Sequence, residues 1–92
     1  MKPDFEWDED KARANLRKHR ISFDEAATVF ADASSVTIPD PDHSTGEQRY
    51  VDIGRSEKDR VLVVIYTERR GSIRIISCRQ ATPSERRAYE EG

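Results

Sequence analysis

Hydrophobic positions along this chain change their period once, from the spacing of helices to the spacing of strands. Four apolar residues in the first third repeat at i, i+3, i+4 and i+7, as on one face of an amphipathic helix: Phe23, Ala26, Ala27 and Phe30. Ser22 precedes them with Glu25 three residues later, which is the arrangement of a capping box. The pattern predicts a helix that starts after Ser22 and buries a Phe/Ala face.

An earlier helix is indicated by the order of charges rather than by apolar spacing. Acidic residues at 8–10 come before the basic and histidine residues at 18–20. Acidic groups near the start of a helix and basic groups near its end interact favourably with the helix dipole. We therefore expect a first helix from about Asp8 to His19.

The second half of the chain has the alternation of strands. Residues 34–47 contain one short β-branched run followed by two prolines and a glycine, which predicts an edge strand and a long loop. Alternation then starts at Gln48, and the stretch Val61–Tyr66 is apolar on both faces, as in a central strand covered on both sides. The last expected strand is Ser72–Arg79. Strict alternation there puts Ile73, Ile75, Ser77 and Arg79 on one face and Arg74, Ile76 and Cys78 on the other.

The C-terminal residues predict a short closing helix. Thr82, Pro83 and Glu85 combine an N-cap residue, a proline at the first helical position and a capping box. Together the elements predict a single α+β domain over residues 1–92, with two N-terminal helices, a four-stranded antiparallel sheet meander and a short C-terminal helix.

Composition and charge limit the class of protein. The 92 residues are 35% hydrophobic and 37% charged, and no apolar run approaches the roughly 18 residues of a membrane span. The expected location is therefore the cytoplasm, with no membrane contact. The net charge of −2 hides an asymmetry, because residues 1–48 hold 6 basic and 11 acidic side chains while residues 49–92 hold 10 and 7. Two basic segments, the basic islands at residues 11–20 and 69–87, are candidates for binding a polyanion if they lie close together in the fold.

The strand and helix at the C-terminus hold the candidate chemistry. Arg79 closes a rigid strand, and Arg86 on the next helix supplies a second guanidinium; such planar forks suit phosphate oxygens. A salt-bridged rim, with Arg86 paired to Glu90, is the alternative interpretation. Tyr89 is a candidate acid or base-stacking platform, although packing on the sheet explains it nearly as well.

Histidines and acidic clusters give weaker signals. His19 is the helical candidate for a general base, with a structural cap as its competing role. His43 lies in the long loop, where a side chain can swing over a substrate. The acidic residues 8–10 suggest a magnesium site in form, but helix capping explains them more simply, so we expect neither metal nor cofactor. One cysteine, Cys78, allows no internal disulfide.

Nearly the whole chain resembles the BrnT family of toxins from type II toxin–antitoxin systems. The resemblance is carried by polar and small residues at fixed spacing: Trp7, Asp8, Lys11, Asn15, Lys18, His19, Phe23, Glu25, Ala26, Ser77, Arg79, Ala81, Thr82, Glu85, Arg86, Tyr89 and Glu90. It departs from the usual pattern at Cys78, where a small Ala is common, and at Gln80, where a basic residue is common.

The resemblance implies a RelE-like fold and a metal-independent endoribonuclease that inhibits translation. It also implies a BrnA-like ribbon-helix-helix antitoxin, a heterotetramer with it, and DNA contact only through that antitoxin. We expect a catalytic set and an RNA-contacting set: Arg79, Arg86, Tyr89 and His19 in the first, and Lys18, Arg74, Arg87 and His43 in the second.

A different class of function stays open, namely a non-catalytic module that binds a DNA-binding protein as partner or co-repressor. The two hypotheses differ in what surrounds Arg79. An open cleft lined by Arg79, Arg86 and Tyr89 favours the enzyme, whereas an acid of the same chain that neutralises Arg79 favours the module.

Overall fold

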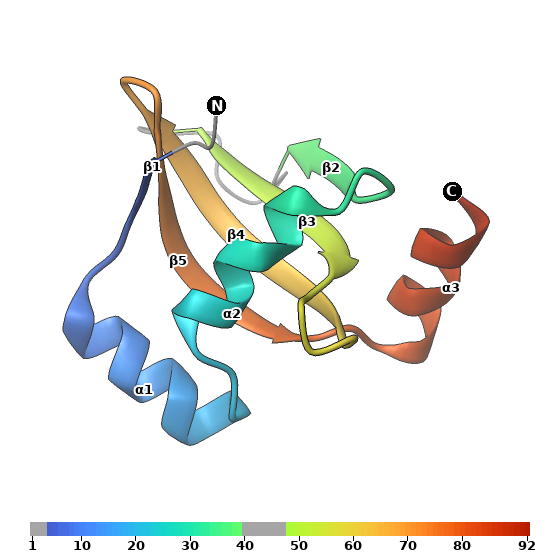
Figure 1. Ribbon diagram of the computed structural model, residues 1–92, viewed down its shortest axis with the longest axis horizontal. Coiled ribbons are helices and arrows are strands. Elements are labelled where there is room, and N and C mark those ends of the chain that lie inside the picture. The colour runs from blue at the N-terminus through green and yellow to red at the C-terminus, as the bar shows by residue number, and fades with distance from the viewer. Residues whose placement is uncertain (1–3, 40–47) are drawn as a thin grey trace.

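A five-stranded sheet forms the centre of the molecule, in the order β1-β5-β4-β3-β2 (Figure 1). The computed structural model describes residues 4–39 and 48–92. The strands are β1 Asp4–Glu6, β2 Val36–Pro39, β3 Arg49–Arg55, β4 Val61–Arg69 and β5 Ser72–Gln80. The helices are α1 Glu9–His19, α2 Phe23–Thr28 with the 3₁₀ turn η1 Val29–Ala31, and α3 Pro83–Glu91.

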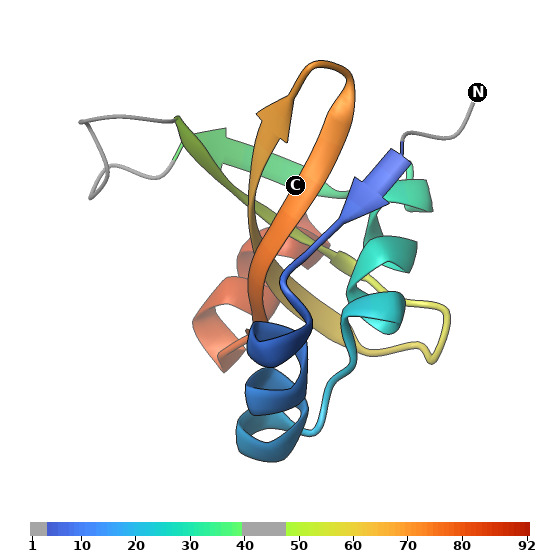
Figure 2. The same ribbon diagram turned by 90° about the vertical axis from the view of Figure 1, so that its left-hand side faces the viewer.

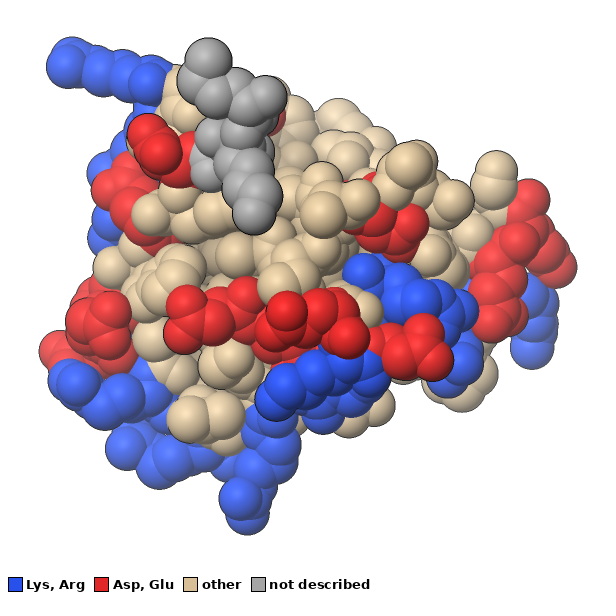
Figure 3. Space-filling view, viewed as in Figure 1, with Lys and Arg blue, Asp and Glu red and all other residues tan. Residues whose placement is uncertain are grey.

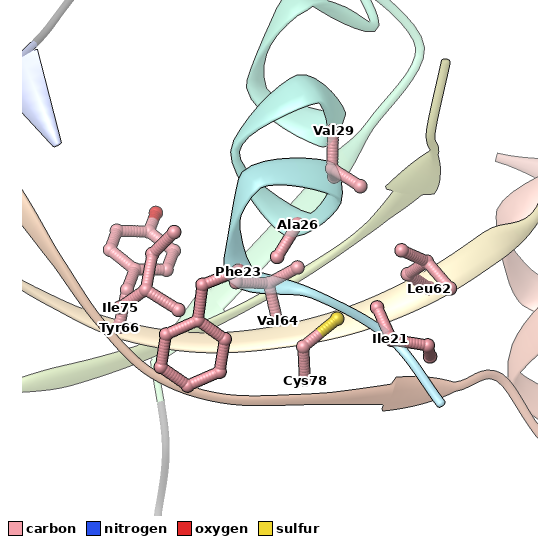
Figure 4. Close-up of a cluster of buried hydrophobic side chains, with 9 residues drawn as sticks. All are labelled: Ile21, Phe23, Ala26, Val29, Leu62, Val64, Tyr66, Ile75 and Cys78. Atoms are coloured by element: carbon pink, nitrogen blue, oxygen red, sulfur yellow. The ribbon is translucent and has the colours of Figure 1, made fainter. Parts of the chain in front are cut away.

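Helices cover the two faces of the sheet unequally. Figure 2 shows α2 on one side of the sheet and α3 on the other, with α1 beside β5. The face under α2 carries the larger core, drawn in Figure 4: Ile21, Phe23, Ala26, Val29, Leu62, Val64, Tyr66, Ile75 and Cys78. The opposite face carries a small cluster of Ile53, Val61 and Val63, against which Tyr89 of α3 packs. The second face is therefore thinly covered.

The expected four-stranded antiparallel meander is wrong in one respect, because the sheet is mixed. Strand β1 pairs in parallel with the first half of β5, with Phe5 opposite Ile73. Three residues are too few to show alternation, so the sequence carries no signal for this strand. The other pairs, β2–β3, β3–β4 and β4–β5, are antiparallel as expected.

The predicted helix starts are confirmed, but the α-helix predicted through Phe30 ends at Thr28 and continues as a 3₁₀ turn, and one predicted cap is only half formed. Asp8 caps α1 by accepting from the Asp10 amide at 3.0 Å, and Ser22 accepts from the Glu25 amide at 3.1 Å. The Glu25 carboxylate does not complete a capping box. It instead accepts from Ser56 Oγ at 2.7 Å and from Arg60, and the Arg60 hydrogen bonds hold the pKa of this buried carboxyl below its usual value. The carboxylate thus ties α2 to the β3–β4 turn.

Strand β5 contains a β-bulge that the strict alternation missed. Ile65 pairs with Ser77 but Tyr66 pairs with Ile75, which leaves Ile76 as an extra residue on β5. Ile75 and Cys78, three positions apart, consequently both lie in the larger core. A bulge of this kind re-aims the side chains that follow it. The predicted division of Ser72–Arg79 into two faces is therefore wrong from Ile76 onward.

The burial predicted for Val61–Tyr66 is confirmed at five of the six residues, the exception being the half-buried Ile65, and it has a testable consequence. Val63 is 2% exposed between the sheet and α3, whereas Ile38 on the edge strand β2 is 45% exposed. Val63→Asp should prevent folding, because an unpaired carboxylate cannot be buried there. Ile38→Asp, the matched control, should fold. Circular dichroism and thermal melting would check both, and a folded Val63→Asp protein would contradict the packing described.

Candidate active site

Arg79 lies at the C-terminal end of β5, on the face of the sheet that α3 covers. Its guanidinium is bound by Glu85 of α3 through two hydrogen bonds, Nη1 to Oε1 at 2.7 Å and Nη2 to Oε2 at 2.8 Å. Nη1 also donates to the Gln80 carbonyl at 3.2 Å. The Arg79 side chain is still 40% exposed, so the ion pair sits at the surface rather than in the core.

The bond to Glu85 fixes the charge state of both partners. The Arg79 hydrogen bonds lower the pKa of Glu85 to about 2, and the carboxylate in turn raises the pKa of Arg79. Because the folded-state pKa of this acid is depressed, the pair stabilises the fold above pH 4.5, the ordinary value, and loses that contribution as the pH falls towards 2. Both groups are therefore ionised throughout the neutral range.

The bulge brings a second arginine to the face of Arg79. Arg74 precedes Ile75 and Arg79 follows Cys78, and both of those neighbours point into the larger core. Successive side chains on a strand point to opposite faces, so Arg74 and Arg79 share the other face. Arg74 is restrained by β1, because its Nη1 lies 3.4 Å from Glu6 Oε2. The sequence had placed these two arginines on opposite faces.

Arg86 and Arg87 lie on the outward side of α3. Arg86 Nε is 3.4 Å from Glu90 Oε2, and both side chains are more than half exposed. This is the surface salt bridge that the sequence offered as the alternative to catalysis, and such pairs contribute about 0–1 kcal/mol to stability. Glu85 and Tyr89 form the inward side of the helix. Arg79, Arg86 and Tyr89 therefore do not converge on one point here.

Tyr89 anchors the end of α3. Its hydroxyl donates to Asp32 Oδ2 at 2.6 Å, and the Arg55 guanidinium lies 5.9 Å from its ring centre. Asp32 Oδ2 also accepts from the Arg55 amide at 2.9 Å, so one carboxylate joins α3 to β3. The hydrogen bond to Asp32 raises the pKa of Tyr89, and a tyrosine held this way is a poor proton donor until the bond opens.

The basic helix α1 is held along β5 by a buried asparagine. Asn15, 7% exposed, accepts from the Cys78 amide at 3.1 Å and donates to the Ile21 carbonyl at 3.1 Å. Lys11 and Lys18, at i−4 and i+3, share the stripe of α1 that carries Asn15. Among the described residues neither lysine has an ionic partner. Figure 3 shows basic side chains gathered over α1.

The positions of the remaining candidate residues point to no role in the site. His19 is the half-buried last residue of α1, and the left-handed residue that ends the helix is Arg20, whose amide donates to the Leu16 carbonyl. His43 lies outside the described residues. Asp8 and Asp10 are used at the start of α1, where Asp10 also pairs with Arg13. In residues 4–39 and 48–92, no helix is long and apolar enough to cross a membrane.

Comparison with known proteins identifies the family. The family model for the ribonuclease toxin BrnT of type II toxin–antitoxin systems matches residues 7–85. This chain belongs to the BrnT family. Its fold is similar to the 1.1 Å crystal structure of the Brucella abortus ribonuclease toxin BrnT, with a TM-score of 0.69 and 23% identity over 87% of this chain and 97% of that one. A comparison with curated protein sequences gives no match.

Two acidic residues of this BrnT-family chain were missed as parts of the site. Glu85 was assigned only to a helix cap, and Asp32 was not assigned at all. A signal for the first exists, since a carboxylate six residues after Arg79 and just inside a helix can reach back to the strand end. No sequence signal points to Asp32, which meets Tyr89 from 57 positions away. The bulge also had a signal, because apolar residues 73, 75, 76 and 78 change phase between 75 and 76.

The anchoring contact of Tyr89 can be tested without reference to activity. Tyr89→Phe removes only the hydroxyl that donates to Asp32, while the Arg55 amide still satisfies that carboxylate. We expect a loss of about 1.5–3 kcal/mol in the free energy of unfolding, the usual contribution of a hydrogen bond to a charged group. Tyr50→Phe is the control, because it removes the same hydroxyl from another half-buried tyrosine, which packs against the larger core instead of α3. Equal stabilities of Tyr89→Phe and wild type in urea titrations would exclude the anchor.

Proposed function

We propose that this chain is a metal-independent endoribonuclease toxin that cleaves RNA in the cytoplasm and thereby inhibits translation. Membership of the BrnT family supplies the class of activity. The observation that carries the proposal is the position of Arg79. It is fixed at a strand end, half exposed, on the same face as Arg74 and next to the basic stripe of α1. Phosphates of a single RNA strand could be held between these groups.

The proposed reaction uses the nucleophile already present in RNA. The ribose 2′-oxygen attacks the neighbouring phosphorus while its proton passes to a base, and the bond from phosphorus to the 5′-oxygen breaks as that oxygen takes a proton. The products are a 2′,3′-cyclic phosphate and a 5′-hydroxyl. An internal nucleophile makes a metal-activated water unnecessary, so the protein has mainly to orient the strand and stabilise charge on the phosphorane.

We assign each candidate residue a role in this reaction or in RNA binding. Arg79 stabilises the phosphorane. Arg86 is kept as a second donor, a role that requires its pair with Glu90 to open and its side chain to turn from the outward side of α3 towards Arg79. Arg74, Arg87 and Lys18 contact the sugar–phosphate backbone, and His43, outside the described residues, is kept as a further RNA contact. His19 is the proposed base. Tyr89 donates a proton or orients a nucleobase only after its bond to Asp32 opens, and its primary role in this proposal is to dock α3.

The alternative function is a non-catalytic module that acts as a partner or co-repressor of a DNA-binding protein. An acid of the same chain neutralises Arg79, which favours the module, and the cleft of Arg79, Arg86 and Tyr89 expected of the enzyme is not formed. The enzyme is preferred because Glu85 engages only one side of the guanidinium. It binds the two Nη atoms, and a phosphate can still approach along the edge formed by Nε and Nη2.

Removal of Arg79 is the sharpest test of the enzymatic proposal. Arg79→Ala should slow cleavage of a single-stranded RNA about 10²-fold or more, the usual effect of one lost transition-state donor. Arg79→Lys should restore little, because a point charge cannot reproduce a bidentate fork. Lys58→Ala removes one positive charge from the exposed β3–β4 turn and serves as the control. The measurement is single-turnover cleavage by purified chain in EDTA, with end-group analysis of the products.

Two results would count against this mechanism. Equal rates for folded Arg79→Ala and wild type would remove Arg79 from the reaction. Loss of wild-type cleavage in EDTA, restored by a divalent cation, would replace the mechanism with a metal-dependent one.

An antitoxin follows from the family, and we propose that it resembles BrnA, with a ribbon-helix-helix segment that binds DNA. The toxin would then reach DNA only through this partner, and a heterotetramer of two toxins and two antitoxins is the expected assembly. The basic islands of this chain offer a surface to acidic residues of the partner.

Inhibition by occlusion makes a measurable prediction. Association with the antitoxin should weaken as ionic strength rises, because charge pairs across the interface are screened. The complex should also lose ribonuclease activity in proportion to the antitoxin bound. Titration of cleavage against antitoxin, with binding measured on the same samples, would check both. A saturated complex that cleaves RNA at the rate of free toxin would exclude occlusion.

A further inference from the structure

Glu85 has no assigned part in the reaction, yet it makes the closest polar contacts of Arg79. We propose that Glu85 is a positioning residue, which holds the Arg79 guanidinium so that its Nε–Nη2 edge faces the scissile phosphate. This inference rests on the proposed function, because it requires Arg79 to act on the phosphate.

Some N–H donors of Arg79 bind acceptors of the protein and others do not. A guanidinium has five N–H donors. Nη1 donates to Glu85 Oε1 at 2.7 Å and to the Gln80 carbonyl at 3.2 Å, and Nη2 donates to Glu85 Oε2 at 2.8 Å. Within residues 4–39 and 48–92, the Nε hydrogen and the second Nη2 hydrogen have no partner. These two lie on one edge of the plane, which is a bidentate site for two phosphate oxygens.

Glu85 is itself held in place at both ends of its side chain. The Thr82 amide donates to Oε1 at 2.9 Å, and the Glu85 amide donates to Thr82 Oγ1 at 3.2 Å, which completes the capping box of α3. The chain just before this box is fixed to the sheet, because the Ala81 amide donates to the Val61 carbonyl at 3.0 Å. The carboxylate is thus a rigid support, and the ordering of the long Arg79 side chain is complete before RNA binds.

The carboxylate of Glu85 has opposite effects on RNA binding and on the chemical step. The two effects can therefore be measured separately. A carboxylate beside a phosphate site weakens attraction of RNA in the ground state. A fixed guanidinium contributes most in the transition state, where the charge on phosphorane oxygens is largest. Removal of the carboxylate should therefore leave RNA affinity equal or higher while it slows the chemical step. If Glu85 instead masked Arg79, its removal would accelerate cleavage.

The experiment compares Glu85→Gln with wild type on one RNA substrate under single-turnover conditions. We expect the maximal rate constant of cleavage to fall about tenfold, a loss of positioning rather than of the donor itself. The RNA concentration that gives half this rate should stay the same or fall. A rise in the rate constant, or a rate constant equal to wild type, would overturn the positioning role.

Glu85→Asp distinguishes geometry from charge. Aspartate keeps the negative charge but is one methylene shorter, so it cannot hold the same fork while the backbone of α3 stays in place. The positioning role requires Glu85→Asp to be slowed like Glu85→Gln. A Glu85→Asp protein with the wild-type rate would show that charge alone matters and would overturn the proposal.

Thr82→Ala controls for damage to α3. It removes the hydroxyl that accepts from the Glu85 amide but leaves the Thr82 amide and the Arg79 pair intact. Its melting temperature should fall, while its cleavage rate constant should fall less than that of Glu85→Gln, because the Thr82 amide still donates to the carboxylate. A Thr82→Ala protein slowed as much as Glu85→Gln would assign the effect to loosening of α3 and contradict positioning.

A spectroscopic readout and the Arg79→Ala protein complete the test. Nitrogen-15 NMR of Arg79 should show restricted rotation of the guanidinium in wild type and free rotation in Glu85→Gln; free rotation in both would overturn the inference. Failure of the inference and of the proposed function remain distinct. If Arg79→Ala is slow and Glu85→Gln is not, only positioning fails; if Arg79→Ala cleaves at the wild-type rate, the role of Arg79 itself fails.

Discussion

The pairing of β4 with β5 around one extra residue is the constraint on which the site depends. Without Ile76 in excess, Ile75 and Cys78 could not both enter the core beneath α2, and Arg74 and Arg79 would point to opposite faces. Burial of the two apolar side chains provides the free energy for the irregularity. The arginines follow because their positions on the strand are fixed relative to those neighbours. One packing requirement thus assembles a pair of cations on the thinly covered face.

A backbone amide at the outer edge of β5 needs a hydrogen-bond partner, and this requirement also determines the geometry of the site. Strand β1 pairs only with Ser72–Arg74, so the Cys78 amide further along has no strand partner. Asn15 of α1 accepts from that amide, and a buried backbone donor is thereby satisfied. The same contact sets α1 along β5, with Lys11 and Lys18 on the stripe of Asn15. A requirement of hydrogen bonding therefore determines where the basic helix lies relative to the arginine face.

The docking of α3 rests on polar contacts together with the packing of one half-buried aromatic ring, Tyr89. No residue of α3 is fully buried, and its inward side chains, Glu85 and Tyr89, bind Arg79 and Asp32 respectively. Chains of this size have limited apolar area to bury, so residues near a site also carry structure. The family resemblance assigned Tyr89 and Arg79 to chemistry, and the geometry gives both a structural contact as well. The ion pair of Arg79 occupies the edge of the guanidinium formed by its two Nη atoms.

Local patterns in the sequence were sufficient for most of the elements of this fold. The charge order of α1, the apolar period of α2, the two-sided apolar run of β4 and the Thr82–Pro83–Glu85 cap each act within a few residues, so the sequence alone determined them. The motif residues also sufficed to recognise the BrnT family, which the family match confirmed.

Tertiary structure decided the features that involve partners distant in the chain. Strand β1 is too short to have a pattern of its own and exists through its pairing with residues 72–74 of β5. The bulge depends on the register against β4, and the bond from Tyr89 to Asp32 joins residues 57 positions apart. Glu25 shows the limit most clearly, since its sequence context offered a local cap while a buried carboxylate required a cation, and Arg60 came from the β3–β4 turn. Burial makes such pairing obligatory, but only the folded chain determines which residue meets it.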